Sequence, residues 1–320
     1  MTDLSYLQAV VIGAMQGVTE LFPVSSLGHS VLVPAWIGGS WASLVTQSGS
    51  ADSGSSPYLA FIVALHVATA VALLVFYART WVAVIGGFIQ VLRTRRVQTS
   101  TQRLSVLIVV ATIPVGITGL ALEHLLRTLF AKPLAAGIFL TLNGLILLAG
   151  ERLRRRSIER SDAEAGVRPV SGASPAAGSA TAAGGTGTMV VAGRALGSLE
   201  YREAAVIGVF QTFALLAGIS RSGITMVGGL LRGLDHEDAA QFSFLLATPV
   251  ILAAGVLKLP SLFGPAGHGI GGQVLVGALV AGLAAYASVR FLTRYFTTRT
   301  LTPFAVYCLV AGVASVIRFA

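Results

Sequence analysis

Six apolar runs constrain the fold of this chain more than any other feature of its sequence. They occupy residues 58–78, 104–123, 133–150, 240–258, 272–292 and 301–319. Each run approaches the ~20 residues that a helix needs to cross the hydrocarbon core of a bilayer. Charged residues make up 11% of the sequence, whereas a soluble domain contains about a quarter. The sequence therefore predicts an all-α integral membrane protein.

Basic residues are unevenly distributed between these runs and set the expected orientation. The net charge is +9, and arginines concentrate at 79–103, 152–160 and 290–299. Cytoplasmic loops of membrane proteins carry an excess of Lys and Arg and lie against anionic lipid. We therefore expect these three segments to be cytoplasmic and both termini to face outward. The expected partner of the basic segments is membrane lipid and not nucleic acid.

Residues 151–198 have a composition unlike the rest of the chain. Charged residues come first, and Ala, Gly, Ser and Thr dominate 173–188. Such a segment buries little apolar surface and favours a flexible linker. We expect a cytoplasmic linker that joins a first membrane half, 1–150, to a second, 199–320. A shorter stretch rich in Ser and Gly, 39–57, is expected to be a loop.

Residues 3–38 are less apolar than the six runs and are interrupted by Pro23. Proline removes a backbone donor and ends a helix, and Ser25 or Ser26 can then cap a second half-helix. A broken helix whose new N-terminus faces a cavity is an anion site. We therefore predict a re-entrant helical hairpin, which is allowed only where protein or a water-filled cavity covers its backbone.

The break in this hairpin also gathers polar side chains. Glu20 follows Gln16 by four positions, so the two share one face of a helix. His29 follows Ser26 by three positions and shares a face of the second half-helix. Ionisable groups at membrane depth are costly and usually functional. This collection of side chains is suited to a phosphate-bearing ligand.

The two halves of the chain repeat. Residues 9–16 align without gaps on residues 204–211, and the same offset places Ser25 on Ser220. A second re-entrant hairpin is therefore expected at 200–233. Each half then contains one broken hairpin followed by three spans, and because three is odd the second half must be inverted. Inverted repeats with broken helices are typical of transporters.

The second hairpin contains the loop 217–223, which holds Arg221 between Gly and Ser residues. The planar fork of a guanidinium is suited to phosphate oxygens, and Gly218 lets the backbone approach a ligand closely. By the repeat, Arg221 should approach the polar cluster of the first hairpin. Three polar neighbours of Arg221 have two possible roles, which are to contact phosphate or to satisfy backbone groups at this break: Ser220, Ser222 and Thr225.

These motifs resemble the undecaprenyl-diphosphatase family, also called bacitracin-resistance proteins. That family shows a (Glu/Gln)-x-x-x-Glu segment running into Pro-Val-Ser-Ser-x-Gly-His, and a second motif Pro-Gly-x-Ser-Arg-Ser-Gly. The corresponding residues here are 16–20, 23–29 and 217–223, and residues 241–249 resemble a further family stretch. The resemblance covers both halves of the chain and leaves out the linker.

Three positions depart from the family pattern. Gln16 leaves Glu20 as the only motif carboxylate, Leu27 replaces a frequent hydroxyl, and Ala217 replaces the motif proline. The turn at Ala217 is therefore expected to be less rigid, and one phosphate contact is expected to be absent.

The resemblance implies an enzyme that hydrolyses undecaprenyl diphosphate to undecaprenyl phosphate and inorganic phosphate. Such an enzyme recycles the lipid carrier for cell-wall synthesis and gives resistance to bacitracin. The resemblance also implies a multi-pass protein of the bacterial cell membrane, a site that opens to the outer face, and a divalent cation such as Mg²⁺ or Ca²⁺. The implied catalytic residues are Glu20, Ser26, His29 and Arg221. The implied substrate-binding residues are Gln16, Ser25, Gly28, Gly218, Ser220, Ser222 and Thr225. The implied metal ligands are Glu20 and Gln16.

Several roles stay open at this stage. Ser26 attacks phosphorus as an activated nucleophile, or it only caps a helix while water attacks with Glu20 or His29 as the base. His66 lies inside an apolar run without a charged companion in sequence, so we interpret it as a hydrogen-bonded core residue. The alternative function is a polyprenyl-phosphate flippase that uses the same cluster only to bind phosphate. The sequence also leaves a homodimer possible.

Overall fold

The computed structural model describes residues 4–48, 57–122, 132–164, 194, 196–258 and 269–320. Within these ranges the regular structure is helical, apart from an isolated bridge between Arg194 and Leu234. The α-helices of the first half are α1 Tyr6–Thr19, α2 Ser26–Ile37, α3 Gly39–Ser48, α4 Pro57–Phe76, α5 Ala78–Thr94, α6 Ser100–Ala121 and α8 Pro133–Glu164. Those of the second half are α9 Tyr201–Thr212, α10 Arg221–Leu230, α11 His236–Lys258, α12 Gly271–Tyr295 and α13 Thr302–Phe319. Two short 3-10 helices, η1 Leu196–Ser198 and η2 Phe213–Leu215, complete the set.

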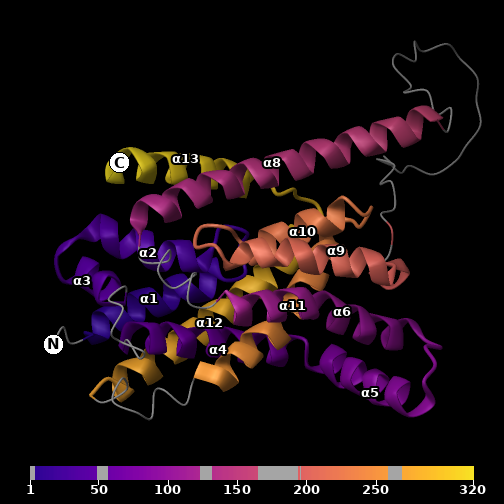
Figure 1. Ribbon diagram of the computed structural model, residues 1–320, viewed down its shortest axis with the longest axis horizontal. Coiled ribbons are helices and arrows are strands. Elements are labelled where there is room, and N and C mark those ends of the chain that lie inside the picture. The colour runs from indigo at the N-terminus through magenta and orange to yellow at the C-terminus, as the bar shows by residue number, and fades with distance from the viewer. Residues whose placement is uncertain (1–3, 49–56, 123–131, 165–193, 195, 259–268) are drawn as a thin grey trace, which may run out of the picture.

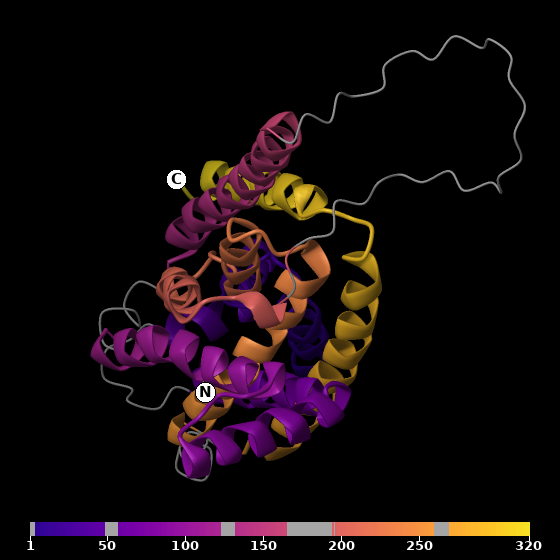
Figure 2. The same ribbon diagram turned by 90° about the vertical axis from the view of Figure 1, so that its right-hand side faces the viewer.

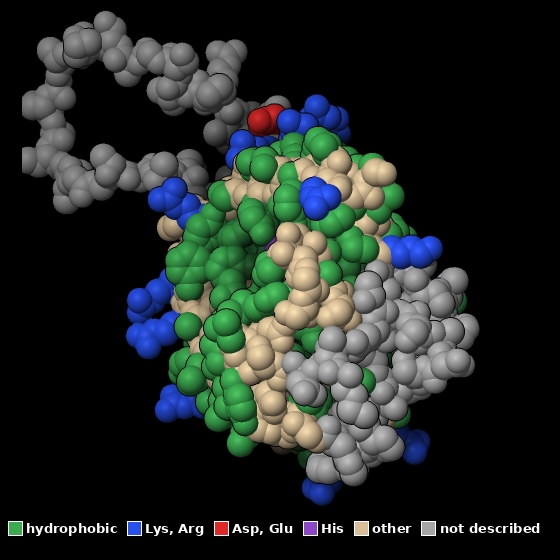
Figure 3. All heavy atoms as spheres, turned by 90° about the vertical axis from the view of Figure 1, so that its left-hand side faces the viewer, with side chains coloured by type: hydrophobic (Ala, Val, Ile, Leu, Met, Phe, Trp, Pro, Cys, Tyr) green, Lys and Arg blue, Asp and Glu red, His purple; other side chains and the backbone are tan. Residues whose placement is uncertain are grey.

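Six of these helices are long and apolar enough to cross a membrane: α4, α6, α8, α11, α12 and α13. They correspond to the six apolar runs, so the prediction of a multi-pass helical membrane protein is confirmed. One face of the molecule is dominated by hydrophobic side chains, while most of the Lys and Arg side chains in view lie toward its margin (Figure 3). This distribution is the one expected of a surface that faces lipid.

The helices pack in pairs that join the two halves of the chain. Helices α8 and α13 lie side by side along one edge of the molecule (Figures 1 and 2). Helix α1 packs on α12, where Gly13 lies against the backbone of Gly277, and α9 packs on α6, where Gly208 lies against the backbone of Ala111. Glycine is needed at both crossings because an added Cβ atom would collide with a carbonyl oxygen of the facing helix.

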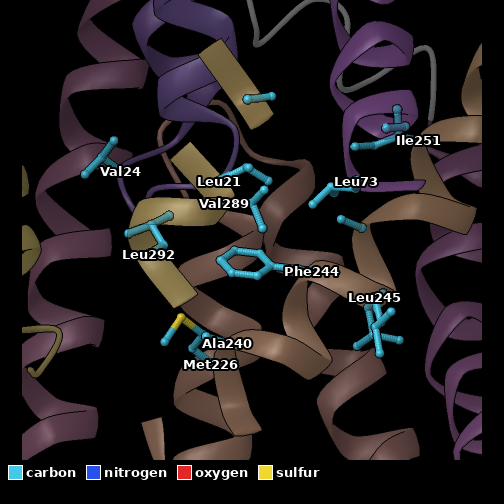
Figure 4. Packing of buried hydrophobic residues seen from close by; sticks show 14 of the residues in the cluster. Leu21, Val24, Leu73, Met226, Ala240, Phe244, Leu245, Ile251, Val289 and Leu292 are labelled. Carbon is cyan, nitrogen blue, oxygen red and sulfur yellow. The ribbon is translucent and has the colours of Figure 1, made fainter. Parts of the chain in front are cut away.

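The hydrophobic core extends to the segment between α1 and α2, which contains Glu20. Phe244 of α11 is fully buried and lies near Val289 and Leu292 of α12 (Figure 4). Leu21, which directly follows Glu20, is also fully buried and points into the same cluster. Burial of such a side chain contributes roughly 1.5–3 kcal/mol, so the segment that carries Glu20 is anchored by packing.

Two of the expected boundaries are wrong. The stretch 39–57 was expected to be a loop, but its first part forms helix α3, and 49–56 lies outside the described residues. Helix α8 continues beyond residue 150 to Glu164, because the charged residues that begin the expected linker include several arginines, which are good helix formers. The rest of the linker, 165–193, lies outside the described residues.

Candidate active site

The first polar loop connects α1 to α2 in the way that the sequence predicts. Helix α1 ends at Thr19, Glu20 is its C-terminal cap, and α2 begins after Pro23. Ser25 is the N-cap of α2, and its hydroxyl oxygen accepts a hydrogen bond from the N–H of Gly28 at 3.2 Å. Ser25 holds a positive φ of 70°, which is uncommon for a residue with a side chain.

The second polar loop connects α9 to α10 and carries a matching cap. Ser220 is the N-cap of α10, and its hydroxyl oxygen accepts from the N–H of Gly223 at 3.1 Å. Arg221 is therefore the first residue of α10. Gly218 has a positive φ of 116°, and a side chain there would collide with the backbone of α8. Glycine is required at this turn for both reasons.

Direct hydrogen bonds join the two loops. The hydroxyl oxygen of Ser25 accepts from the N–H of Gly218 at 3.1 Å. Asn143 of α8 donates from Nδ2 to the carbonyl of Pro23 at 3.0 Å and accepts at Oδ1 from the N–H of Ser220 at 2.9 Å. Asn143 is fully buried, so it fixes the distance between the loops. No motif in the sequence singled out this residue.

Glu20 is the centre of the side-chain cluster. Its Oε2 accepts a hydrogen bond from the Ser26 hydroxyl at 2.5 Å and from Nε2 of Gln16 at 3.0 Å, and its Oε1 accepts from Nη2 of Arg221 at 2.7 Å. All four residues come from positions that the sequence singled out, and the predicted approach of Arg221 to the first hairpin is confirmed. Within the described residues, Nη1 of Arg221 and Oε1 of Gln16 are buried without a hydrogen-bond partner.

His29 does not reach the Ser26 hydroxyl, although the two share a helix face. Its Nδ1 lies 2.7 Å from the carbonyl oxygen of Ser25, and its Nε2 lies 2.7 Å from the hydroxyl of Tyr307 on α13. Since a carbonyl only accepts, Nδ1 carries a proton and donates it to Ser25, while Nε2 is occupied by the hydroxyl of Tyr307. Neither ring nitrogen of His29 bonds to the Ser26 hydroxyl in this arrangement, and the role of His29 as a base stays a prediction.

His66 is the site residue that the sequence interpretation missed. Its Nδ1 lies 2.8 Å from the carbonyl of Ile62, as expected for a core histidine, but its Nε2 lies 3.3 Å from Oε2 of Glu20. The charged companion that the sequence appeared to lack comes from another helix, so no local pattern could have revealed it. His66 contributes the fourth polar side chain at the Glu20 carboxylate.

The remaining predicted residues support the second loop more than they line the cluster. The hydroxyls of Ser220 and Ser222 lie 3.0 Å apart. Thr225 donates its hydroxyl to the carbonyl of Arg221 at 2.7 Å and lies 2.6 Å from the hydroxyl of Ser243. Among these contacts, the hydrogen bond from Thr225 to Arg221 satisfies a backbone carbonyl, and a contact of these residues with phosphate stays a prediction. Gly28 packs directly against Gly218, which makes it a close-approach position between the loops.

The donor set at Glu20 does not fit a divalent cation held by the protein alone. Both carboxylate oxygens already accept hydrogen bonds, and the Arg221 guanidinium lies at one of them. The described residues contain no group of three His, Cys, Asp or Glu side chains placed to hold a metal. The unpartnered Oε1 of Gln16 offers a single further oxygen, whereas Mg²⁺ takes six oxygen ligands, several of them from water and substrate phosphates.

Comparison with known proteins identifies the family. The family model described as Bacitracin resistance protein BacA matches residues 9–314. The chain is 65% identical to Undecaprenyl-diphosphatase 2 of Frankia alni, over 100% of this chain and 99% of that protein. It is 59% identical to Undecaprenyl-diphosphatase of Mycolicibacterium paratuberculosis and 58% identical to that of Mycobacterium avium, each over 99% of this chain and 98% of the relative. The chain therefore belongs to the bacitracin resistance protein BacA family.

Proposed function

We propose that this protein is an undecaprenyl-diphosphatase, which hydrolyses undecaprenyl diphosphate to undecaprenyl phosphate and inorganic phosphate. It thereby recycles the lipid carrier for cell-wall synthesis and gives resistance to bacitracin. The observation that carries the proposal is the Glu20 carboxylate, which joins the Ser26 hydroxyl of one loop to the Arg221 guanidinium of the other. A hydroxyl beside a base and a fixed cation are the parts that phosphoryl transfer needs.

The geometry favours Ser26 as the nucleophile and Glu20 as its base. The Ser26 hydroxyl already donates to Glu20, so its proton passes to the carboxylate as Oγ bonds to the terminal phosphorus. The bond from that phosphorus to the bridging oxygen breaks, and undecaprenyl phosphate leaves with the electron pair. Water then hydrolyses the phosphoserine and releases inorganic phosphate. Attack by water with His29 as the base has less support, because both ring nitrogens of His29 bond elsewhere.

Arg221 stabilises the charge that develops on the transferred phosphoryl group. Its Nη2 bonds to Glu20, while its buried Nη1 has no partner among the described residues. An unpaired buried donor is costly, and a phosphate oxygen would satisfy it. Arg221 is the first residue of α10, so the positive end of the helix dipole adds to the attraction for an anion.

We propose that the divalent cation, Mg²⁺ or Ca²⁺, enters as part of the substrate, bound to the diphosphate. Oε1 of Gln16 is the oxygen available to it at the site, and Glu20 lies beside Gln16. When bound, the cation would neutralise phosphate charge. The sequence predicts Glu20 and Gln16 as ligands of the cation, and this assignment keeps Gln16 in that role.

We propose that the two halves form an inverted repeat with re-entrant hairpins at 3–38 and 200–233. The caps support this, because the Ser25–Gly28 bond and the Ser220–Gly223 bond are equivalent under the offset of the repeat. The helix crossings also support it, because Gly13 and Gly208 are equivalent positions and each packs on a facing backbone. The proposed units are a first half at 1–150, a linker whose first part continues α8, and a second half at 199–320.

We propose that the protein lies in the bacterial cell membrane, with the site open to the outer face and the arginine-rich segments in the cytoplasm. The test is cysteine labelling in a background without Cys308, which is the single cysteine of the chain. An impermeant reagent added to intact cells should not label residue 180. Labelling from outside would overturn the orientation. The homodimer stays a prediction, which light scattering of the purified protein in detergent tests.

Phosphate release by the purified protein in detergent tests the function itself. The wild-type protein should convert undecaprenyl diphosphate into equal amounts of inorganic phosphate and undecaprenyl phosphate, and a chelator should slow the reaction. Ser26→Ala should remove the activity. A lipid flippase would release no phosphate in detergent, and the named relatives of this chain do not support that alternative. The absence of phosphate release from folded wild-type protein would overturn the proposal.

A further inference from the structure

The two nitrogens of the His29 ring have partners from opposite halves of the chain. Nδ1 lies 2.7 Å from the carbonyl oxygen of Ser25, which is four residues earlier in the same segment. Nε2 lies 2.7 Å from the hydroxyl of Tyr307, which belongs to α13. The His29 and Tyr307 rings also stack, with centroids 5.7 Å apart and planes that differ by 12°. Tyr307 therefore ties His29 to the second half of the chain.

Helix α13 holds Tyr307 in a fixed place beside His29. It packs closely on α8, where a Cβ atom added at Gly144 would lie 2.9 Å from the carbonyl oxygen of Ala305 and from the backbone nitrogen of Leu309. These two contacts flank Tyr307, so the backbone on both sides of it is fixed by packing. Tyr307 is 46% exposed and His29 is 6% exposed, so the tyrosine side chain reaches from the surface to a buried ring.

His29 in turn fixes the backbone next to Ser26. The carbonyl oxygen of Ser25 accepts two hydrogen bonds from His29, one from its backbone N–H at 3.2 Å and one from Nδ1 at 2.7 Å. This carbonyl and the backbone nitrogen of Ser26 belong to one planar peptide unit. Ser25 also holds a φ of 70°, and such a conformation persists only where surrounding contacts maintain it. The orientation of the His29 ring therefore affects the position of Ser26.

A histidine ring that is bonded at one nitrogen alone can still turn. The χ2 torsion of histidine is broad, and a carbonyl oxygen accepts hydrogen bonds over a wide range of directions. A second bond at the opposite nitrogen removes this freedom. The Tyr307 hydroxyl supplies that bond at Nε2, so the ring is held in one orientation toward the Ser25 carbonyl.

Resting on the proposed phosphatase function, we propose that Tyr307 is a positioning residue of the reaction. Its hydroxyl holds the His29 ring, and the ring holds the Ser25 carbonyl. The Ser26 hydroxyl is thereby kept 2.5 Å from Oε2 of Glu20. A misplacement of about 1 Å in a reacting group can lower a rate a hundredfold, so the loss of this support should appear in kcat.

Tyr307→Phe tests the proposal because it removes the hydroxyl and keeps the ring that stacks on His29. Ser315→Ala is the matched control. The Ser315 hydroxyl of α13 accepts a hydrogen bond from Nε1 of Trp36 of α2 at 3.1 Å. This bond joins the same two helices about two turns further along, so a role that is only structural would be shared by both bonds.

The two variants should differ in the kinetics of phosphate release from undecaprenyl diphosphate. Tyr307→Phe should lower kcat roughly tenfold to a hundredfold and leave KM within about twofold of the wild-type value. Ser315→Ala should leave both constants unchanged. Melting temperatures in detergent confirm that both variants are folded. A wild-type kcat in folded Tyr307→Phe, or an equal fall in kcat in Ser315→Ala, would overturn the proposal.

A double-mutant cycle measures whether Tyr307 acts through His29. His29→Ala removes the ring, so adding Tyr307→Phe to it should lower kcat by no more than about twofold further. A further fall as large as the one that Tyr307→Phe causes in the wild-type protein would show that Tyr307 acts by another route. That result would also overturn the proposal.

A measurement without substrate separates this proposal from the proposed function. Nitrogen-15 NMR of histidine-labelled protein in detergent detects the ring nitrogens, and His29→Gln assigns those of His29. Tyr307→Phe should shift the Nε2 signal of His29, and Ser315→Ala should leave it in place. An unshifted signal in Tyr307→Phe would overturn the positioning role and leave the phosphatase proposal intact. A shifted signal together with no phosphate release by the wild-type protein would overturn the function, and the role of Tyr307 in it as well.

Discussion

Ser25 and Gly218 are joined by a hydrogen bond of 3.1 Å from the backbone N–H of Gly218 to the hydroxyl oxygen of Ser25. The same oxygen accepts from the N–H of Gly28, so the cap of α2 is also the tie to the opposite loop. Ser25 holds this position at a φ of 70°. The strain is retained because one hydroxyl satisfies two backbone donors from the two halves of the chain.

Two substitutions of Ser25 should measure separately the stability that its hydroxyl contributes and the stability that is lost through its positive φ. Ser25→Ala removes the acceptor and keeps the strain, so it should cost about 1–3 kcal/mol, since two buried N–H groups lose their partner. Ser25→Gly removes the acceptor but relieves the positive φ, so it should be the less destabilised of the two. Melting temperatures in detergent measure the difference. Equal losses in the two variants would show that Ser25 is unstrained.

The glycines at the two helix crossings should tolerate no side chain. Gly13→Ala places a methyl group against the carbonyl of Gly277, and Gly208→Ala places one against the carbonyl of Ala111. Each should cost typically 1–3 kcal/mol through overpacking. Gly116→Ala is the control, because a side chain at Gly116 meets open space, and it should leave the melting temperature unchanged or raise it. Loss of stability in the control alone would contradict this packing.

Local features of the site could be predicted from sequence. Pro23 and Ser25 indicate the break between α1 and α2, and the structure has that break. The repeat also predicted that Arg221 approaches the cluster around Glu20, although the two residues are far apart in sequence. The break could be predicted because a proline and a capping residue act on their own few neighbours, whereas the approach of Arg221 could be predicted only from the repeat.

The partners from other helices could not be predicted in the same way. His66, Tyr307 and Asn143 reach the loops from α4, α13 and α8. In a helix that is apolar all round, the pattern of the sequence does not say which side faces a neighbour. The contacts of these three residues depend on how the helices rotate and slide against each other, which only tertiary packing decides.

The composition of the linker predicts that its central part has no role in activity. Replacement of 166–192 by a Gly/Ser segment of the same length should leave phosphate release largely unchanged. The replacement stops before Arg194, which bonds to Glu203 at 2.7 Å and to Ser198. Arg194→Ala is the comparison variant and should lower the melting temperature. Loss of activity in the replaced protein at normal expression would reveal a function for this segment.

Glu20 and Arg221 carry the central claim, which is that catalysis needs one charged residue from each loop. Glu20→Gln keeps the shape of the side chain but removes the base. Arg221→Lys keeps the charge but loses the planar fork of the guanidinium. The lysine ammonium cannot reproduce both Nη2, which bonds to Glu20, and Nη1, which we propose to bond to phosphate. Each change should lower kcat/KM by roughly a hundredfold or more, because an interaction with a charged group is worth a few kcal/mol.

The most direct measurement is the rate of phosphate release from undecaprenyl diphosphate by purified Arg221→Lys, beside wild-type protein and Glu20→Gln. Melting temperatures near that of the wild-type protein confirm that the variants are folded. The account predicts that both folded variants fall at least roughly a hundredfold below the wild-type rate. A folded Arg221→Lys variant that releases phosphate at the wild-type rate would contradict it.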